Sequence, residues 1–413
     1  MAEGDRSIRD WATHRSENSR CSGILLHPTS LPGPHGIGSL GRQALAFVDF
    51  LEASEQCIWQ VLPLGPTGYG DSPYQSYSSF AGNPLLIDLE ELLKEGFLAP
   101  EHLRGAPDFP EDHVEFGRVF AFKRELLKKA HLYWKRRGDS ASRREFDAFC
   151  QRERSWLEDF SLFMALNRTF EAEGLAGAWS SWPAELIRRE ADAMEHWRKS
   201  AAEEIEQQKF QQFLFFRQWD TVKRYAGERG IRIIGDLPIY VAYDSADAWS
   251  NQELFYFDKN GLPTVVAGVP PDYFSETGQL WGNPIYNWER HKETGYRWWI
   301  ERIRANLHIV DSLRLDHFRG FEAYWEVPAE EETAVNGKWV SAPVDDFFHH
   351  LLRKFACLPI IAEDLGTISA DVRETMRRYR LPGMRVLLFA FGEDFPNGAF
   401  LPHNHVKNCL VYT

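Results

Sequence analysis

The sequence predicts an α/β protein built as a (β/α)8 TIM barrel with helical and loop insertions. Short apolar runs that end in polar or turn residues recur along the chain. Helix-like stretches separate several of them, which is typical of parallel β/α units. The chain has 413 residues, and barrels of this type with insertions run from roughly 200 to more than 400 residues.

Seven segments are predicted as barrel strands, with the longest gap between the second and the third. They are residues 23–27, 57–64, 231–236, 308–316, 359–364, 384–391 and 409–413. A helix is predicted before the strand at 384–391, because Ser369 can cap it, Asp371 favours its first turn and Pro382 with Gly383 ends it. Closing an eight-stranded barrel requires every strand to pair on both sides, so we expect the C-terminal strands to be missing from this chain.

Changes in composition and in the spacing of apolar residues divide the chain into three parts. We expect the first part of the barrel at 21–90, a mostly helical insertion at 91–224 and the remaining barrel at 225–413. The insertion is predicted from charged segments whose apolar residues recur at helical spacing. Residues 240–288 are rich in Gly, Pro, Asp and aromatic residues, which favours a long ordered loop that covers the substrate at the barrel mouth.

Composition excludes several classes of partner. The 60 acidic and 47 basic side chains leave a net charge of −13, which repels nucleic acids and anionic membrane surfaces. The five cysteines are scattered and form no C-x-x-C pair, so we expect buried thiols in a reducing compartment, with no metal site and no cofactor. The polar N-terminus lacks an apolar segment, and we expect a soluble cytoplasmic protein.

Two carboxylates stand one step past predicted strands, where a parallel barrel exposes side chains at its active-site face. Asp316 ends the run RLD, and Arg314 points the same way because side chains alternate along a strand. Glu363 follows the apolar run PIIA, which would desolvate it and raise its pKa. A nucleophile and a proton donor on neighbouring strands, with carboxyl groups roughly 5 Å apart, would suit a retaining glycosidase.

Each carboxylate also has a purely structural interpretation. Asp316 could form a salt bridge with Arg314, and Glu363 could cap a helix at a strand end. Asp236, at the end of the predicted strand 231–236, could be a structural Asp before a turn. The sequence alone does not decide between the structural and the catalytic interpretations of these three carboxylates.

Two further segments offer groups that suit sugars. The loop 267–288 combines Pro-Pro rigidity with Tyr273, Phe274 and Trp281 and with the amides of Gln279 and Asn283, and flat apolar rings stack against sugar rings. The same aromatic side chains could instead pack the loop. Residues 62–84 offer Ser72 and Tyr74, and no Gly-Lys-Ser/Thr follows their glycines, which excludes a phosphate loop.

Long strings carry a resemblance to a known family. They are LLHPTSLPGPHGIGSLG, WQVLPLGPTGYGDSPYQSYSSFAGNP, GDLPIYV, VPPDYFSETGQLWGNP, RLDHFRGFEAYWEVP and IIAEDLGTI. With these strings the chain resembles the amylomaltases, or 4-alpha-glucanotransferases (disproportionating enzymes), from residue 21 to residue 413.

The resemblance implies roles for particular residues. Asp316 corresponds to the nucleophile and Glu363 to the acid/base, while Arg314 and His317 correspond to substrate-binding residues beside the nucleophile. The remaining glucan contacts that it implies are Ser72, Tyr74, Asp236 and Trp281. The activity implied is a retaining transfer of α-1,4-glucan segments between maltooligosaccharide, starch or glycogen chains and a sugar acceptor, without a cofactor.

One departure from the family pattern bears on activity. In the family a Gly-Thr-His-Asp-Asn string with a third catalytic carboxylate follows the Val-Tyr-Thr that ends this chain. Because that acid would stabilise the transition state, we expect this chain alone to be inactive and poorly stable. The alternatives are an α-glucan hydrolase on the same barrel and a catalytically inert glucan-binding protein.

Overall fold

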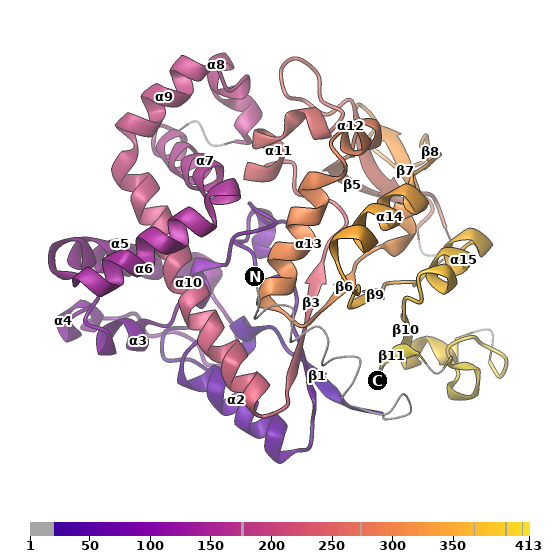
Figure 1. Cartoon of the computed structure of the whole chain (residues 1–413), viewed down its shortest axis with the longest axis horizontal. Helices are drawn as coiled ribbons and strands as arrows, with labels where there is room; N and C mark the ends of the chain where they lie inside the picture. The colour runs from indigo at the N-terminus through magenta and orange to yellow at the C-terminus, as the bar shows by residue number, and fades with distance from the viewer. Residues whose placement is uncertain (1–19, 175–176, 273–274, 367, 393–394, 407) are drawn as a thin grey trace.

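The computed structural model describes residues 20–174, 177–272, 275–366, 368–392, 395–406 and 408–413, and its centre is a parallel sheet (Figure 1). The sheet order is β1-β2-β3-β6-β9, and β10 and β11 form a further parallel pair. A bond of 2.8 Å from the Ala362 N–H to the Pro382 carbonyl joins β9 to the start of β10, so the pair continues the sheet. The predicted parallel α/β architecture is confirmed. The strands are β1 (Gly23–Leu25), β2 (Ile58–Gln60), β3 (Arg232–Leu237), β6 (Ser312–Leu315), β9 (Ile360–Ala362), β10 (Gly383–Val386) and β11 (Cys409–Tyr412).

A helix precedes each later strand of the sheet up to β10, as expected for β/α units. The predicted cap of α15 is present, since the Ser369 side chain accepts a bond from the Val372 N–H, and Asp371 lies in the first turn. These helices are α2 (Arg42–Ala53), α10 (Ala202–Glu228), α13 (Arg297–Ile309), α14 (Val344–Lys354) and α15 (Ala370–Arg378).

Two of the predicted strands include residues that are helical in the structure. Residues 308 and 309 belong to the end of α13, where the Val310 N–H still bonds the Asn306 carbonyl, and β6 begins only at Ser312. Residues 387–391 form a 3-10 helix after β10. Apolar runs of this length fit a helix end and a strand equally well, so the hydrophobic pattern alone did not separate them.

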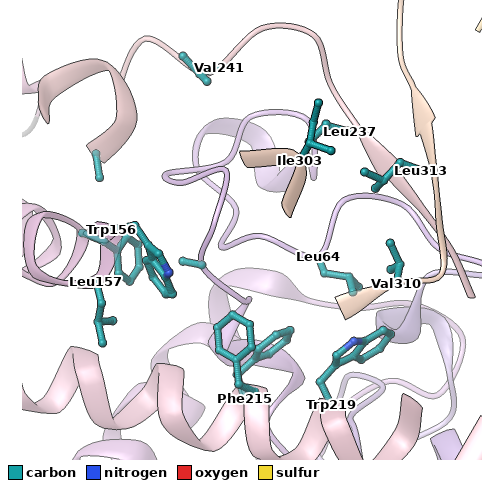
Figure 2. Close-up of a cluster of buried hydrophobic side chains, with 14 of the residues drawn as sticks. Leu64, Trp156, Leu157, Phe215, Trp219, Leu237, Val241, Ile303, Val310 and Leu313 are labelled. Carbon is teal, nitrogen blue, oxygen red and sulfur yellow. The ribbon is translucent and has the colours of Figure 1, made fainter. Parts of the chain in front are cut away.

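Helices occupy most of the chain between β2 and β3. The last of them, α10, contacts α2, α5, α6, α7, α9, α13 and β3, and its side chains connect the helices before it to the barrel. Figure 2 shows Phe215 and Trp219 of α10 between Trp156 and Leu157 of α7 and the barrel residues Val310 and Leu313. The other helices here are α3 (Leu89–Lys94), α4 (Pro100–Leu103), α5 (Phe116–Arg137), α6 (Ser140–Arg152), α7 (Arg154–Ala172), α8 (Ala184–Ile187) and α9 (Ala191–Ser200).

Two buried glutamines of α10 form hydrogen bonds with main-chain groups of the segment after β2. Gln212 accepts from the Gly82 N–H at 2.7 Å and donates to the Gly82 carbonyl at 2.9 Å. Gln218 accepts from the Asp88 N–H at 2.7 Å and donates to the Asp88 carbonyl at 3.1 Å. Each side-chain amide therefore satisfies both main-chain groups of one buried residue, which would otherwise cost free energy.

A second sheet was not predicted from the sequence. The region 240–288, expected to be a loop, contains α11 (Ala246–Ser250), β4 (Val265–Val269) and β5 (Gln279–Pro284), and α12 (Trp288–Glu293) follows. These two strands join β7 (Ala323–Pro328) and β8 (Lys338–Ser341) in an antiparallel sheet of order β5-β4-β7-β8. The β4–β5 pairing carries a register shift between Val266 and Gly268, and bulges of this kind interrupt the period-two alternation.

No described helix is both long and apolar enough to span a bilayer. The structure also contains short 3-10 helices. Those that lie near strand ends or connections are η1 (Pro28–Ser30), η2 (Tyr69–Asp71), η3 (Pro84–Leu86), η4 (Trp179–Ser181), η5 (Gln252–Leu254), η6 (Phe318–Phe321), η7 (Leu387–Phe391) and η8 (Pro402–Asn404).

Replacing Gln218 by Leu tests the role of these glutamines. The substitution leaves the buried Asp88 N–H without its partner and removes one bond to the Asp88 carbonyl, so we expect a loss of about 1–3 kcal/mol in the free energy of unfolding. The shift of the urea midpoint measures it. Thr221→Val, at an exposed position of the same helix, is the control and should change stability by less than about 0.5 kcal/mol. Equal midpoints for the two variants would contradict this role.

Candidate active site

Strand register brings three carboxylates together at the carboxyl edge of the sheet. In the pairing of β3 with β6, Asp236 lies opposite Arg314. In the pairing of β6 with β9, Leu315 lies opposite Ala362, so Asp316 and Glu363 are the next residues along these two neighbouring strands. Main-chain hydrogen bonding between the two strands continues at this position, since the Glu363 N–H donates to the Leu315 carbonyl at 3.0 Å.

Arg314 connects two of these carboxylates. Its Nη1 lies 2.7 Å from both oxygens of Asp236, and its Nη2 lies 2.7 Å from Oδ1 of Asp316. Arg314 and Asp316 therefore share a face, as the alternation along the strand predicts. The side chain of Asp236 is 1% exposed, whereas that of Asp316 is 28% exposed, so Asp316 is the one that a ligand can reach.

Asp236 has a second partner from far away in the sequence. The Tyr74 hydroxyl donates to its Oδ2 at 2.7 Å. Burial raises the pKa of Asp236 to about 6 although the Arg314 charge opposes the shift, so the carboxyl is mostly ionised at neutral pH. An ionised Asp236 holds Arg314 in place, and Arg314 in turn orients Asp316.

Glu363 is held differently from Asp316. Its Oε1 accepts from the Leu365 N–H at 2.7 Å, and its Oε2 accepts from the His317 N–H at 2.9 Å. The residue is 9% exposed. Burial raises its pKa to about 6, and the Asp316 charge adds to the shift while the two N–H bonds oppose it. The carboxyl can therefore hold a proton closer to neutrality than an ordinary glutamic acid can.

The rings of Trp281, His317 and Tyr240 pack together beside these acids. The ring of Trp281, on β5, meets the His317 ring edge-on, with centroids 4.8 Å apart and planes at 83°, and Tyr240 lies behind it at 6.2 Å. Burial, together with the Arg319 charge, lowers the pKa of His317 to about 4, so its imidazole is neutral. His317 has φ 45° and ψ 53°, the left-handed conformation in which its N–H bonds Glu363.

The other predicted contacts lie at the edge of this site or support it. The Gln279 Oε1 accepts from the Trp281 Nε1 at 3.1 Å and orients the indole. Asn283 is buried, and its Nδ2 donates to the Val241 carbonyl at 2.8 Å. The Ser72 hydroxyl accepts from the Tyr74 N–H at 3.3 Å. Their contacts with substrate remain predictions. The predicted aromatic residues Tyr273 and Phe274 lie outside the described residues.

Sequence reasoning missed a tyrosine that interacts with the charged groups of the site. Tyr412, at the end of β11, donates to the Gln60 Oε1 at 2.9 Å. Burial raises its pKa, and the charges of Arg314, Asp236 and Glu363 also act on it. Its position one step from the end of a strand, like those of the acids, was a signal that could have identified it.

Asp364 points away from the acids and joins two strands. Its Oδ1 accepts from the Met384 N–H at 2.6 Å, and its Oδ2 lies 3.0 Å from the Arg385 Nη1. A Cβ at Gly383 would meet the Asp364 carboxylate at 2.7 Å. The glycine at the start of β10 therefore allows this carboxylate to approach the main chain.

Metal chemistry finds no support among the residues described. No group of three or more His, Cys, Asp or Glu side chains in these residues could hold a metal ion. The five cysteines are not in disulfide bonds. They are partly exposed rather than buried as expected, since four lie in connections or at strand ends and Cys150 lies on α6.

Comparison with known proteins identifies the family of the chain. The family model described as 4-alpha-glucanotransferase matches residues 26–413. The 4-alpha-glucanotransferases of Synechocystis sp. and Thermus thermophilus are each 50% identical to the chain, over 96% of it and 78% of their own length.

Solved structures agree as well. An amylomaltase from Streptococcus agalactiae, in complex with acarbose, superposes with a TM-score of 0.91 and 41% identity, over 96% of this chain and 79% of that one. An amylomaltase from Corynebacterium glutamicum, 20% identical, shares the fold with a TM-score of 0.77 over 100% of this chain and 55% of its own. The chain therefore belongs to the 4-alpha-glucanotransferase family, the amylomaltases.

Proposed function

We propose that this 4-alpha-glucanotransferase moves α-1,4-glucan segments by double displacement, with Asp316 as the nucleophile and Glu363 as the acid/base. The observation that carries the proposal is the register of β6 and β9, which sets the two acids side by side. Their environments also differ: Asp316 is paired with Arg314 and partly exposed, whereas Glu363 is buried with a raised pKa. Paired acids with such different environments suit a nucleophile and a proton donor.

In the first half of the reaction, an oxygen of Asp316 attacks the anomeric carbon of the donor. The bond from that carbon to the glycosidic oxygen breaks, and Glu363 gives its proton to the departing oxygen. Arg314 occupies Oδ1 of Asp316, which leaves Oδ2 for the attack. A covalent glycosyl ester on Asp316 results.

In the second half, Glu363 takes the proton of an acceptor 4-hydroxyl. That oxygen attacks the anomeric carbon and displaces Asp316, so two inversions give overall retention. Transfer requires the acceptor to be held better than water. We assign part of this task to Trp281, whose indole is fixed by Gln279 and His317 and offers a ring face to a sugar.

The supporting residues complete the proposed site. Tyr74 and Asp236 position Arg314 through the bonds described above, and Ser72, His317 and Asn283 are proposed as further glucan contacts. Maltooligosaccharides, starch and glycogen are the proposed donors. The cytoplasmic location expected from the cysteines remains a prediction, as does the carboxyl separation of roughly 5 Å that retention favours.

Products from maltotriose test transfer against hydrolysis in protein that contains this chain. We expect a ladder of longer oligomers together with free glucose, since each transfer joins a donor segment to another sugar. Chromatography of the oligosaccharides measures it. Glucose and maltose alone would identify an α-glucan hydrolase, and maltotriose that is bound but left intact would favour the inert binding protein.

Asp316→Asn tests the nucleophile. An amide cannot form the glycosyl ester, so we expect the transfer rate and any hydrolysis to fall by at least about 10³-fold, with maltooligosaccharide affinity nearly unchanged. Initial rates and calorimetric titration measure the two quantities. Asp371→Asn, at an exposed position on α15, is the control and should retain full activity. Near-normal turnover by Asp316→Asn would remove Asp316 from this role.

Glu363→Gln tests the raised pKa through stability rather than activity. A carboxyl whose pKa rises on folding, from 4.5 to about 6, binds its proton more tightly in the folded state. The stability that this provides is present below pH 4.5 and is lost as the pH rises through about 6.

The stability of the parent relative to Glu363→Gln should therefore be greater at pH 5 than at pH 7.5, by about 1 kcal/mol. Urea unfolding of both proteins at the two pH values measures this difference. A stability difference between the two proteins that is the same at both pH values does not affect this comparison. An equal or opposite pH dependence would show that burial does not raise the pKa of Glu363.

A further inference from the structure

Arg314 has a third partner besides the two carboxylates. Its Nε donates to the Met384 Sδ at 3.3 Å, while its Nη1 bonds Asp236 and its Nη2 bonds Asp316. All three nitrogen atoms of the guanidinium therefore have a partner. Because the group is planar and its donors point in fixed directions, bonds on all three nitrogens fix its orientation as well as its position.

The main chain of Met384 is itself held in place. Met384 lies on β10, and its N–H donates to Oδ1 of Asp364 at 2.6 Å. The other oxygen of Asp364 lies 3.0 Å from the Arg385 Nη1. Asp364 directly follows Glu363 in the chain, so the segment that carries the proposed acid also fixes the start of the Met384 side chain. This matters because a methionine side chain has three rotatable bonds.

The surroundings of Met384 are apolar, and its sulfur is what distinguishes it from an ordinary core residue. Met384 is 4% exposed and forms a buried cluster with Ile234 of β3 and Ile361 of β9. A leucine would fill a similar volume there. A thioether sulfur accepts a weak hydrogen bond, whereas a hydrocarbon does not. Since the sulfur is neutral, it bonds the Arg314 Nε–H without adding a third negative charge beside the two carboxylates.

We propose that Met384 is a positioning residue for the transfer reaction, whose sulfur holds the Arg314 guanidinium in the orientation in which Nη2 bonds Oδ1 of Asp316. That bond leaves Oδ2 of Asp316 for the attack on the anomeric carbon. Met384 acts through Arg314 and not on the sugar itself. The inference rests on the proposed function, in which Asp316 is the nucleophile.

Two substitutions of Met384 separate positioning from packing. Met384→Leu keeps the apolar volume and loses the acceptor. Met384→Gln has a side chain of similar length whose carbonyl oxygen can accept from the Arg314 Nε, but it places an amide in an apolar cluster. Met194→Leu, at a buried position of α9, is the matched control for the loss of a buried sulfur away from the acids.

Initial rates of transfer from maltotriose, in protein that contains this chain, measure kcat and KM. We expect kcat to fall about five- to tenfold in Met384→Leu, the loss of one hydrogen bond to a charged group, with KM changed by less than about twofold. In Met384→Gln we expect kcat to return to within about twofold of the parent, because an acceptor is present again. Met194→Leu should keep the kcat of the parent.

Urea unfolding of the same variants supplies the readout that a packing role would not give. Met384→Gln should be less stable than Met384→Leu, since it buries an amide among apolar side chains, and yet be the more active of the two. Activity that instead follows stability, with Met384→Leu the more active, would overturn the proposal. A parent-like kcat in Met384→Leu would also overturn it, which decides the question if Met384→Gln does not fold.

The Asp316→Asn variant separates this inference from the proposed function. If Asp316→Asn is inactive while Met384→Leu turns over like the parent, the positioning role of Met384 is wrong and the proposed nucleophile stands. Near-normal turnover by Asp316→Asn would refute the proposed function itself, whatever the rate of the Met384 variants.

Discussion

The arrangement of the site depends on one guanidinium group. Arg314 contacts both oxygens of the buried Asp236 and one oxygen of Asp316, so a single charge on β6 fixes carboxylates from two strands. Removing one partner of a buried pair leaves an unpaired charge, which costs several kcal/mol. Because side chains alternate, a one-residue slip of β6 would turn Arg314 and Asp316 to the opposite face. Strand register and the electrostatics of the site therefore support each other.

The same edge of the sheet gives neighbouring acids different properties. Asp316 remains partly exposed beside a permanent positive charge, whereas Glu363 is buried after the apolar residues of β9 and accepts from two main-chain N–H groups. Burial favours the neutral form and a nearby cation favours the charged form. The same sheet edge thus supplies a partly exposed carboxylate and a buried carboxyl group whose pKa is raised.

Local patterns predicted the parts of the site that lie within one strand. Alternation placed Arg314 beside Asp316, and the apolar run before Glu363 indicated its burial. The Tyr74–Asp236 bond joins residues 162 apart, a contact that no local pattern specifies. The sheet containing β4 and β5 was missed because a register shift and the Gly-Asn-Pro end of β5 conceal its alternation. The left-handed backbone of His317 is likewise set by its tertiary bond to Glu363.

Trapping the covalent intermediate tests the central claim most directly. A 5-fluoroglucosyl fluoride slows breakdown of a glycosyl-enzyme ester more than its formation, so the labelled protein can be digested and its peptides weighed by mass spectrometry. We expect one added glycosyl group, located on Asp316, and no label in Asp316→Asn. A label on Glu363 or Asp236, with Asp316 unmodified, would contradict it.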